Sequence, residues 1–147
     1  MKGARLLENV KALKACRAGE RVSFRARVLR AWEMGGLRMC LVGDESALMR
    51  VDLGEATVQP GLSYEFHDAL VREYPSSSLR AGPGGWHSAS MVEGSSLEVL
   101  SEDIPISQDE AYIEFTYKIL TGVQRKKARR EGRVEQWRHP AAGEPRT

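Results

Sequence analysis

A strict alternation of apolar and polar side chains near the N-terminus constrains the fold of this chain more than any other feature. Val22, Phe24, Ala26 and Val28 take every second position over residues 21–28, and three arginines stand among the polar side chains between them. In a β-strand, side chains at every second position point to the same face of the sheet. The pattern therefore predicts a strand with one buried face and one solvated face.

Four further strands are expected downstream of this one. Turn residues at 43–46 separate two short alternating runs, and a long fourth strand offers Tyr64 and Phe66 as core positions. The last run is interrupted near Gly94, a residue that breaks strands. The expected strands cover residues 37–42, 49–53, 62–74 and 86–100.

Five strands in this order predict a small closed barrel. The fold class expected is all-β, a five-stranded oligonucleotide/oligosaccharide-binding (OB) barrel over residues 19–104, with SH3-like barrels as the nearest alternative. A short N-terminal helix is expected within residues 1–18, because Leu6, Val10 and Leu13 recur at helical spacing.

The segment after the barrel carries signals for both a helix and a strand. Ser107 and Glu110 have the spacing of a capping box, and acidic residues precede basic ones, as suits a helix dipole. Apolar and polar residues also alternate over residues 113–119, which is typical of a strand. We favour a C-terminal helix over residues 105–132, followed by a disordered basic tail over residues 133–147.

Composition excludes several classes of function. The net charge is −1 over residues 1–106 and +3 over residues 107–147, so binding to a phosphate backbone would need local basic stripes. No apolar run reaches the roughly 20 residues of a membrane span. The two cysteines and three histidines lack metal-ligand spacing, which predicts no metal site and an intracellular protein, nuclear in a eukaryote and otherwise cytoplasmic. No catalytic constellation or cofactor motif stands out, so an enzyme is not expected.

Four local motifs, taken in order, resemble the replication protein A-like OB family, in particular its simple single-stranded DNA-binding proteins of archaeal and eukaryotic type. The first strand, residues 21–29, is similar to the family's first strand. The Val-Gly-Asp-Glu-Ser run at 42–46 resembles its "V-G-D-E-T-G" turn. Residues 58–61 resemble its "I-x-P-G" entry to the fourth strand, and residues 66–70 its "I-x-N-A-W" segment. The resemblance implies an OB fold and single-strand binding in replication or repair.

The chain departs from that family at the positions of its stacking aromatics. Gly54 and Leu70 stand where the family carries aromatic residues, whereas Tyr74 keeps the third. Ala47 replaces the turn glycine, a residue suited to a positive φ. Two of the three usual platforms for bases are therefore absent from the expected binding face.

The remaining aromatic and basic residues define the candidate nucleic-acid site. Tyr74 and Trp86 bracket a Ser-, Gly- and Pro-rich loop that contains Arg80, and Trp32 ends the first strand. These aromatics are candidate platforms for bases, with barrel capping and packing on a terminal helix as the structural alternatives. Outward arginines on neighbouring strands would form a basic stripe, unless they are solvated or paired with carboxylates such as Asp52. These arginines are Arg25, Arg27, Arg38 and Arg50.

Two functions follow from these residues. The first is binding of single-stranded DNA, with RNA as the alternative ligand, in replication or repair. The second is assembly with partner OB subunits, or with a second copy, through residues 107–131, because the expected helix carries more apolar residues than one contact needs. The basic run between Arg125 and Arg138 has three possible roles: it would add affinity for any nucleic acid, act as a nuclear-localisation signal, or only form the solvated end of the helix.

Overall fold

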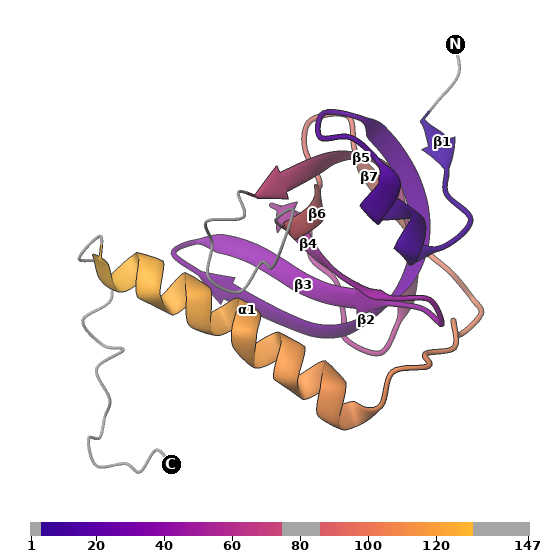
Figure 1. The fold of residues 1–147 in the computed structure, drawn as a ribbon. Helices are drawn as coiled ribbons and strands as arrows, with labels where there is room; N and C mark the ends of the chain where they lie inside the picture. The colour runs from indigo at the N-terminus through magenta and orange to yellow at the C-terminus, as the bar shows by residue number, and fades with distance from the viewer. Residues whose placement is uncertain (1–3, 75–85, 131–147) are drawn as a thin grey trace.

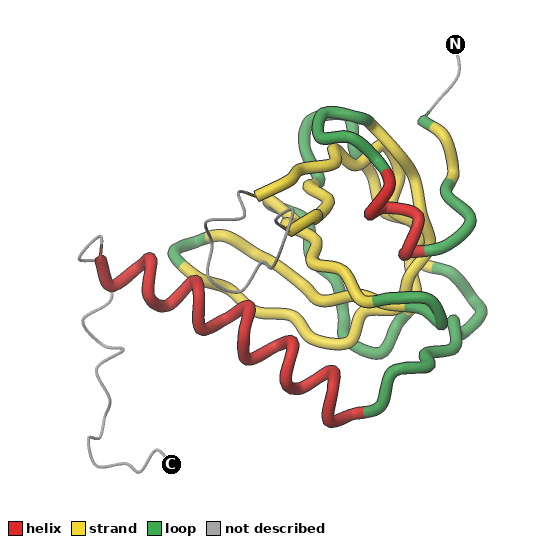
Figure 2. The backbone as a smooth tube through the Cα atoms, in the orientation of Figure 1, coloured by secondary structure: helices red, strands yellow, loops and turns green. Residues whose placement is uncertain are grey.

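β-Strands are the main secondary structure of the described chain (Figures 1 and 2). The computed structural model describes residues 4–74 and 86–130. Its helical elements are a 3-10 helix near the N-terminus and an α-helix near the C-terminus, η1 (Val10–Ala15) and α1 (Glu110–Arg130). The strands are β1 (Arg5–Leu6), β2 (Arg21–Met34), β3 (Leu37–Gly43), β4 (Leu48–Gly54), β5 (Ser63–Tyr74), β6 (Trp86–Ser90) and β7 (Ser96–Val99).

Five of the strands close into a ring. The antiparallel pairs are β2 with β3, β3 with β4, β6 with β5, and β5 with β2, while β4 and β6 pair in parallel. Two short strands lie outside the ring, β1 beside β2 and β7 beside β5. The mostly β architecture is thus confirmed. The interruption expected near Gly94 is also confirmed, since this residue has φ 95° in the turn that separates β6 from β7.

The face of β2 that alternation marks as apolar lies at the centre of the ring. Val22, Phe24, Ala26 and Val28 are at most 1% exposed. Phe24 stacks on Phe66 of β5, with 4.9 Å between the ring centroids and 12° between the ring planes. The buried faces of the five ring strands therefore form one core, as period two predicts.

The prediction of an α-type N-terminal helix, based on helical spacing, is wrong. Its residues form the short 3-10 helix η1, and Leu6 belongs to β1, where it is 48% exposed. Hydrogen bonds hold the beginning of η1: the Asn9 side chain accepts from Ala12 N, and the Asp44 carboxylate accepts from Val10 N. Because Asp44 lies in the turn between β3 and β4, these bonds fix η1 to the ring, where it packs against β2, β4 and β6.

The helix expected after the ring is confirmed, although it begins at Glu110. Asp109 is its cap, since its carboxylate accepts a hydrogen bond from Tyr112 N. Ile113 and Leu120 are buried against Leu41 of β3, so the helical spacing of these residues prevails over their alternation. Among the described residues no helix has the length and apolarity needed to cross a membrane.

Candidate nucleic-acid interface

Arg25 belongs to a polar cluster on the outer side of β2, β5 and β7. Its Nε lies 2.7 Å from Oε1 of Glu65, the residue opposite it on β5. This hydrogen bond, together with the negative charge of Glu65, raises the pKa of Arg25. His67 continues the cluster, with its two ring nitrogens 3.4 Å from Glu65 and 3.1 Å from Glu98 of β7. Arg25 is therefore one member of a row of polar contacts that links three strands.

The same cluster holds the one group in the described residues with metal-ligand geometry. One ligand atom from each of Glu65, His67 and Glu98 lies within 4.8 Å of the others. The cysteines and histidines have no zinc-type spacing, but Glu65 and His67 are two residues apart on one strand face, and this spacing is visible in the sequence. The ion pairs among these groups and Arg25 already account for the arrangement.

Among the other arginines of the expected stripe, Arg27 shares the outer face of β2 with Arg25, two residues along the strand, whereas Arg38 lies apart from both. Arg27 donates to the carbonyl of Ile104, at 3.3 Å, and lies opposite Gly43 at the end of β3. Arg38 lies near the beginning of β3, where its Nε is 3.4 Å from Glu33 and its Nη1 donates to the carbonyl of Glu55. Five residues of strand separate Arg38 from Gly43, or about 17 Å. The four arginines thus do not form one continuous stripe.

Arg50 lies in a different row, on the outer face of β4. Its register partner on β6 is Ser88, and the register partner of Ser88 on β5 is Arg72. Two strand spacings separate the two arginines, or about 10 Å between their Cα atoms. The next row holds Asp52, Ser90 and Leu70 in the same order. We call the residues of these rows that carry polar side chains the arginine face: Arg50, Asp52, Arg72, Ser88 and Ser90.

Polar contacts on the arginine face leave one hydroxyl without a partner. Arg50 Nε lies 3.0 Å from Asp52 Oδ1, and Arg72 Nε donates to Ser90 Oγ at 2.9 Å. Ser88 lies between these pairs, and its buried Oγ has no hydrogen-bond partner in the structure that is described. A buried hydroxyl without a partner is uncommon in folded proteins.

Tyr74 and Trp86 extend the arginine face toward one end. The two residues are register partners at the ends of β5 and β6. Strand alternation puts position 74 on the same face as Arg72, and position 86 on the same face as Ser88. Arg80 lies outside the described residues. The structure therefore adds Arg72 to the candidate site, and its signal in the sequence was its position two residues before Tyr74.

Trp32 lies on the other side of the ring, under α1. Its ring meets that of Tyr117 edge to face, with 5.4 Å between the centroids, and it also packs on Met34 and Met39. Packing on a terminal helix, the structural alternative for Trp32, is thus present. Stacking of a base on Trp32 stays a prediction.

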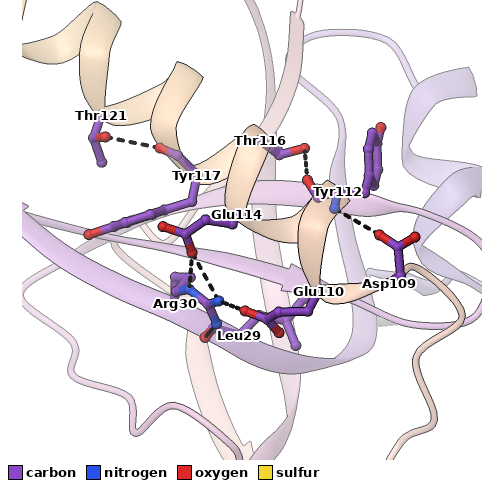
Figure 3. A network of polar contacts seen from close by, with 9 residues as sticks. All are labelled: Leu29, Arg30, Asp109, Glu110, Tyr112, Glu114, Thr116, Tyr117 and Thr121. Atoms are coloured by element: carbon purple, nitrogen blue, oxygen red, sulfur yellow. Dashed lines mark hydrogen bonds and ion pairs between the residues drawn. The ribbon is translucent and has the colours of Figure 1, made fainter. Parts of the chain in front are cut away.

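Charge fixes α1 to β2 as well (Figure 3). Arg30 Nη2 pairs with Glu110 and with Glu114, the latter at 3.1 Å. Burial opposes the charge of Arg30, but hydrogen bonds to the two glutamates outweigh it and raise the pKa of Arg30. These ion pairs place α1 along the outer side of β2 and β3 and turn both carboxylates toward the sheet.

The two positions that lack the aromatics of the resembled family have local explanations. Gly54 has φ 66°, and a Cβ there would lie 3.1 Å from the Met91 carbonyl. A tryptophan is therefore disfavoured at this turn. Leu70 is half-buried opposite Ser90, beside the arginine face. Ala47 has no positive φ, because Asp44 holds the turn through hydrogen bonds from Ser46 N and Ala47 N.

No protein family model matches the chain. No curated protein sequence matches it either. Among solved structures, an OB domain from Methanosarcina mazei is 22% identical, with a TM-score of 0.56 over 71% of this chain and 90% of that domain.

Two other similar structures are longer than the matched region. The p204 HINb domain is 16% identical, with a TM-score of 0.52 over 63% of this chain and 46% of that one. A murine DNA-binding protein bound to double-stranded DNA is 15% identical, with a TM-score of 0.51 over 67% of this chain and 50% of that one. The chain thus has the OB fold and spans about half the length of these two relatives.

Proposed function

We propose that this protein binds single-stranded nucleic acid, DNA in preference to RNA, on the arginine face. The observation that carries the proposal is the register row Arg50–Ser88–Arg72, which brings two guanidinium groups to one face beside an unpartnered hydroxyl. Guanidinium groups recognise phosphate oxygens. Tyr74 and Trp86, at the end of the same face, would supply surfaces for base stacking.

The position of α1 on the ring supports binding of the nucleic acid on the arginine face. OB folds bind oligonucleotides on the face of their second and third strands and on the loops that flank it, which here correspond to β3 and β4. Leu41 on the outer side of β3 is covered by Ile113 and Leu120 of α1. Since α1 covers this part of β3, the proposed path runs over β4, β6 and β5, where Arg72 is exposed and Arg50 is half-buried.

Replication or repair is the process that we propose, because it is implied by the resemblance to single-stranded DNA-binding proteins. The murine relative, which has double-stranded DNA bound, is a case of this fold associated with DNA. The role proposed here is that of a binding protein and includes no catalytic step.

Fluorescence anisotropy with labelled oligo-dT at low salt tests the proposal. We expect saturable binding below tens of micromolar protein, the scale of nonspecific nucleic-acid affinity. Arg72→Ala should weaken this binding, whereas Arg25→Ala is a matched control because Arg25 is paired with Glu65 on another side of the ring. Absence of binding at tens of micromolar would reject the proposal. Equal losses in the two variants would reject the arginine face as the site.

Assembly with other subunits through α1 is the second candidate. Tyr112 and Phe115 on α1 are 52% and 59% exposed, which is unusual for large aromatic side chains. Light scattering on the full chain tests this function, since a mass above that of one chain is expected if α1 joins copies. A monomer that recruits no OB subunit would count against it.

A further inference from the structure

The outer side of α1 carries an exposed aromatic stripe that the packing of the helix does not use. Ile113 and Leu120 face the ring and are 5% exposed. The exposed rings of Tyr112 and Phe115 and the half-buried Ile119 recur at spacings of three and four residues on the other side, which makes them neighbours on the helix surface. We call these three residues the outer stripe.

We propose that the outer stripe is a second contact surface for the single-stranded nucleic acid, on which Tyr112 and Phe115 stack on bases. This inference rests on the proposed function and extends it from the sheet to the helix. Aromatic rings are surfaces for base stacking because every base has a π-face, whatever its sequence. The helix would thereby supply the platforms that Gly54 and Leu70 do not.

The charges on α1 favour a polyanion, such as a nucleic acid, as the ligand of the outer stripe. Over residues 110–122, the carboxylates of α1 are Glu110 and Glu114, and both pair with Arg30 on the sheet side (Figure 3). Lys118 is exposed. About 15 Å beyond Phe115, at the rise of an α-helix, the basic end of α1 begins. Its basic residues are Arg125, Lys126, Lys127, Arg129 and Arg130.

A second copy of the chain fits this surface less well. Two antiparallel α1 helices would place the basic end of each against the first turns of the other. The glutamates of those turns are already engaged by Arg30, so the basic ends would gain little from them. In a parallel pair, the two basic ends would repel each other. A nucleic acid, in contrast, brings both π-faces and phosphates to one helix face.

Leucine substitutions separate base stacking from a hydrophobic protein contact. Tyr112→Leu/Phe115→Leu keeps apolar surface on α1 but removes both π-faces, and it should preserve the fold because the two side chains are exposed. We expect the affinity for labelled oligo-dT to fall by about fivefold or more for each lost stacking contact. Val99→Ala is the control, because Val99 is as exposed as Phe115 and lies on β7. Thermal melts verify that each variant is folded.

The outcomes distinguish this inference from the proposed function. Wild-type binding together with an unchanged affinity in the leucine variant would overturn the inference and leave the arginine face intact. An alanine pair, Tyr112→Ala/Phe115→Ala, that lowers the mass in light scattering without changing oligo-dT affinity would assign the stripe to protein assembly, which also overturns it. If the wild-type chain does not bind, the proposed function fails and the inference fails with it.

Discussion

Arg50 and Arg72 are both register partners of Ser88, although the chain places them on strands that do not pair with each other. This relationship exists because β6 lies between β4 and β5. It pairs with β4 in parallel and with β5 antiparallel. A ring of this topology thus brings two arginines from distant positions in the sequence to one face. Binding of a phosphate backbone on this face depends on this row.

The first prediction concerns salt. Each phosphate contact to a single strand contributes about 0.7 to the slope of log affinity against log salt. Arg50→Ala/Arg72→Ala should therefore lower the magnitude of the slope by roughly 1.4, twice the contribution of one contact. Anisotropy titrations with oligo-dT at several salt concentrations measure it. A slope equal to that of the wild-type chain would show that neither guanidinium contacts phosphate.

The second prediction concerns the attachment of α1. Arg30→Ala removes the ion pairs to Glu110 and Glu114, and we expect a loss of about 1 kcal/mol in the free energy of unfolding, since the pairs are partly exposed. Urea denaturation measures this loss. Arg38→Ala is the matched control, because its ion pair with Glu33 lies at an exposed hairpin and should contribute less. Equal effects would mean that Arg30 has no special role in holding the helix.

The alternation in the sequence was sufficient to predict the strands but not their register. Val22 to Val28 lie in the core, as period two requires. A register shift between Val28 and Arg30 then changes which residues face outward, and it brings Arg30 to α1. Bulges of this kind depend on pairing across the sheet, and a single strand's pattern does not reveal them. Arg72 was missed for another reason: the expected stripe used arginines of the first three strands, and the insertion of β6 between β4 and β5 brings Arg72 to the row of Arg50.

A second bulge, between β2 and β5, coincides with one of the motifs that resemble the OB family. Two residues of β2, Val22 and Phe24, pair with Ala69 and Phe66, which leaves one extra residue on β5. Asp68 lies there with φ 55°, a conformation that Asp and Asn tolerate better than most residues. The family's "I-x-N-A-W" segment has Asn at this position. The Asn position of the motif therefore corresponds here to a backbone requirement, which Asp68 meets.

The third prediction separates the two sides of α1. Leu120→Ala should lower the free energy of unfolding by about 2–3 kcal/mol, because a buried leucine leaves a cavity against Leu41. Phe115→Ala should change it by less than about 0.5 kcal/mol, since its ring is 59% exposed. Thermal or urea unfolding of both variants measures the difference. A large loss in Phe115→Ala would instead place this ring in a packed interface.

The fourth prediction concerns the cysteines, which are both free and buried. Burial, and next the negative charge of Asp52, raise the pKa of Cys40 far above its ordinary value, and burial likewise raises that of Cys16. Because the thiolate is the reactive form, a disulfide reagent at pH 8 should label neither thiol before unfolding. The unfolded chain ionises first, so stability should fall as pH rises above about 8.5. Rapid labelling of the native protein would contradict this.

The most direct test of the account is an amide NMR titration of the full chain with oligo-dT. Chemical-shift changes report where the ligand lies, without the need for a substitution. We predict the largest changes at Arg50, Ser88 and Arg72, with further changes at Tyr112 and Phe115 on the outer side of α1. Changes centred on Arg25 and Glu65, or none at saturating oligonucleotide, would contradict it.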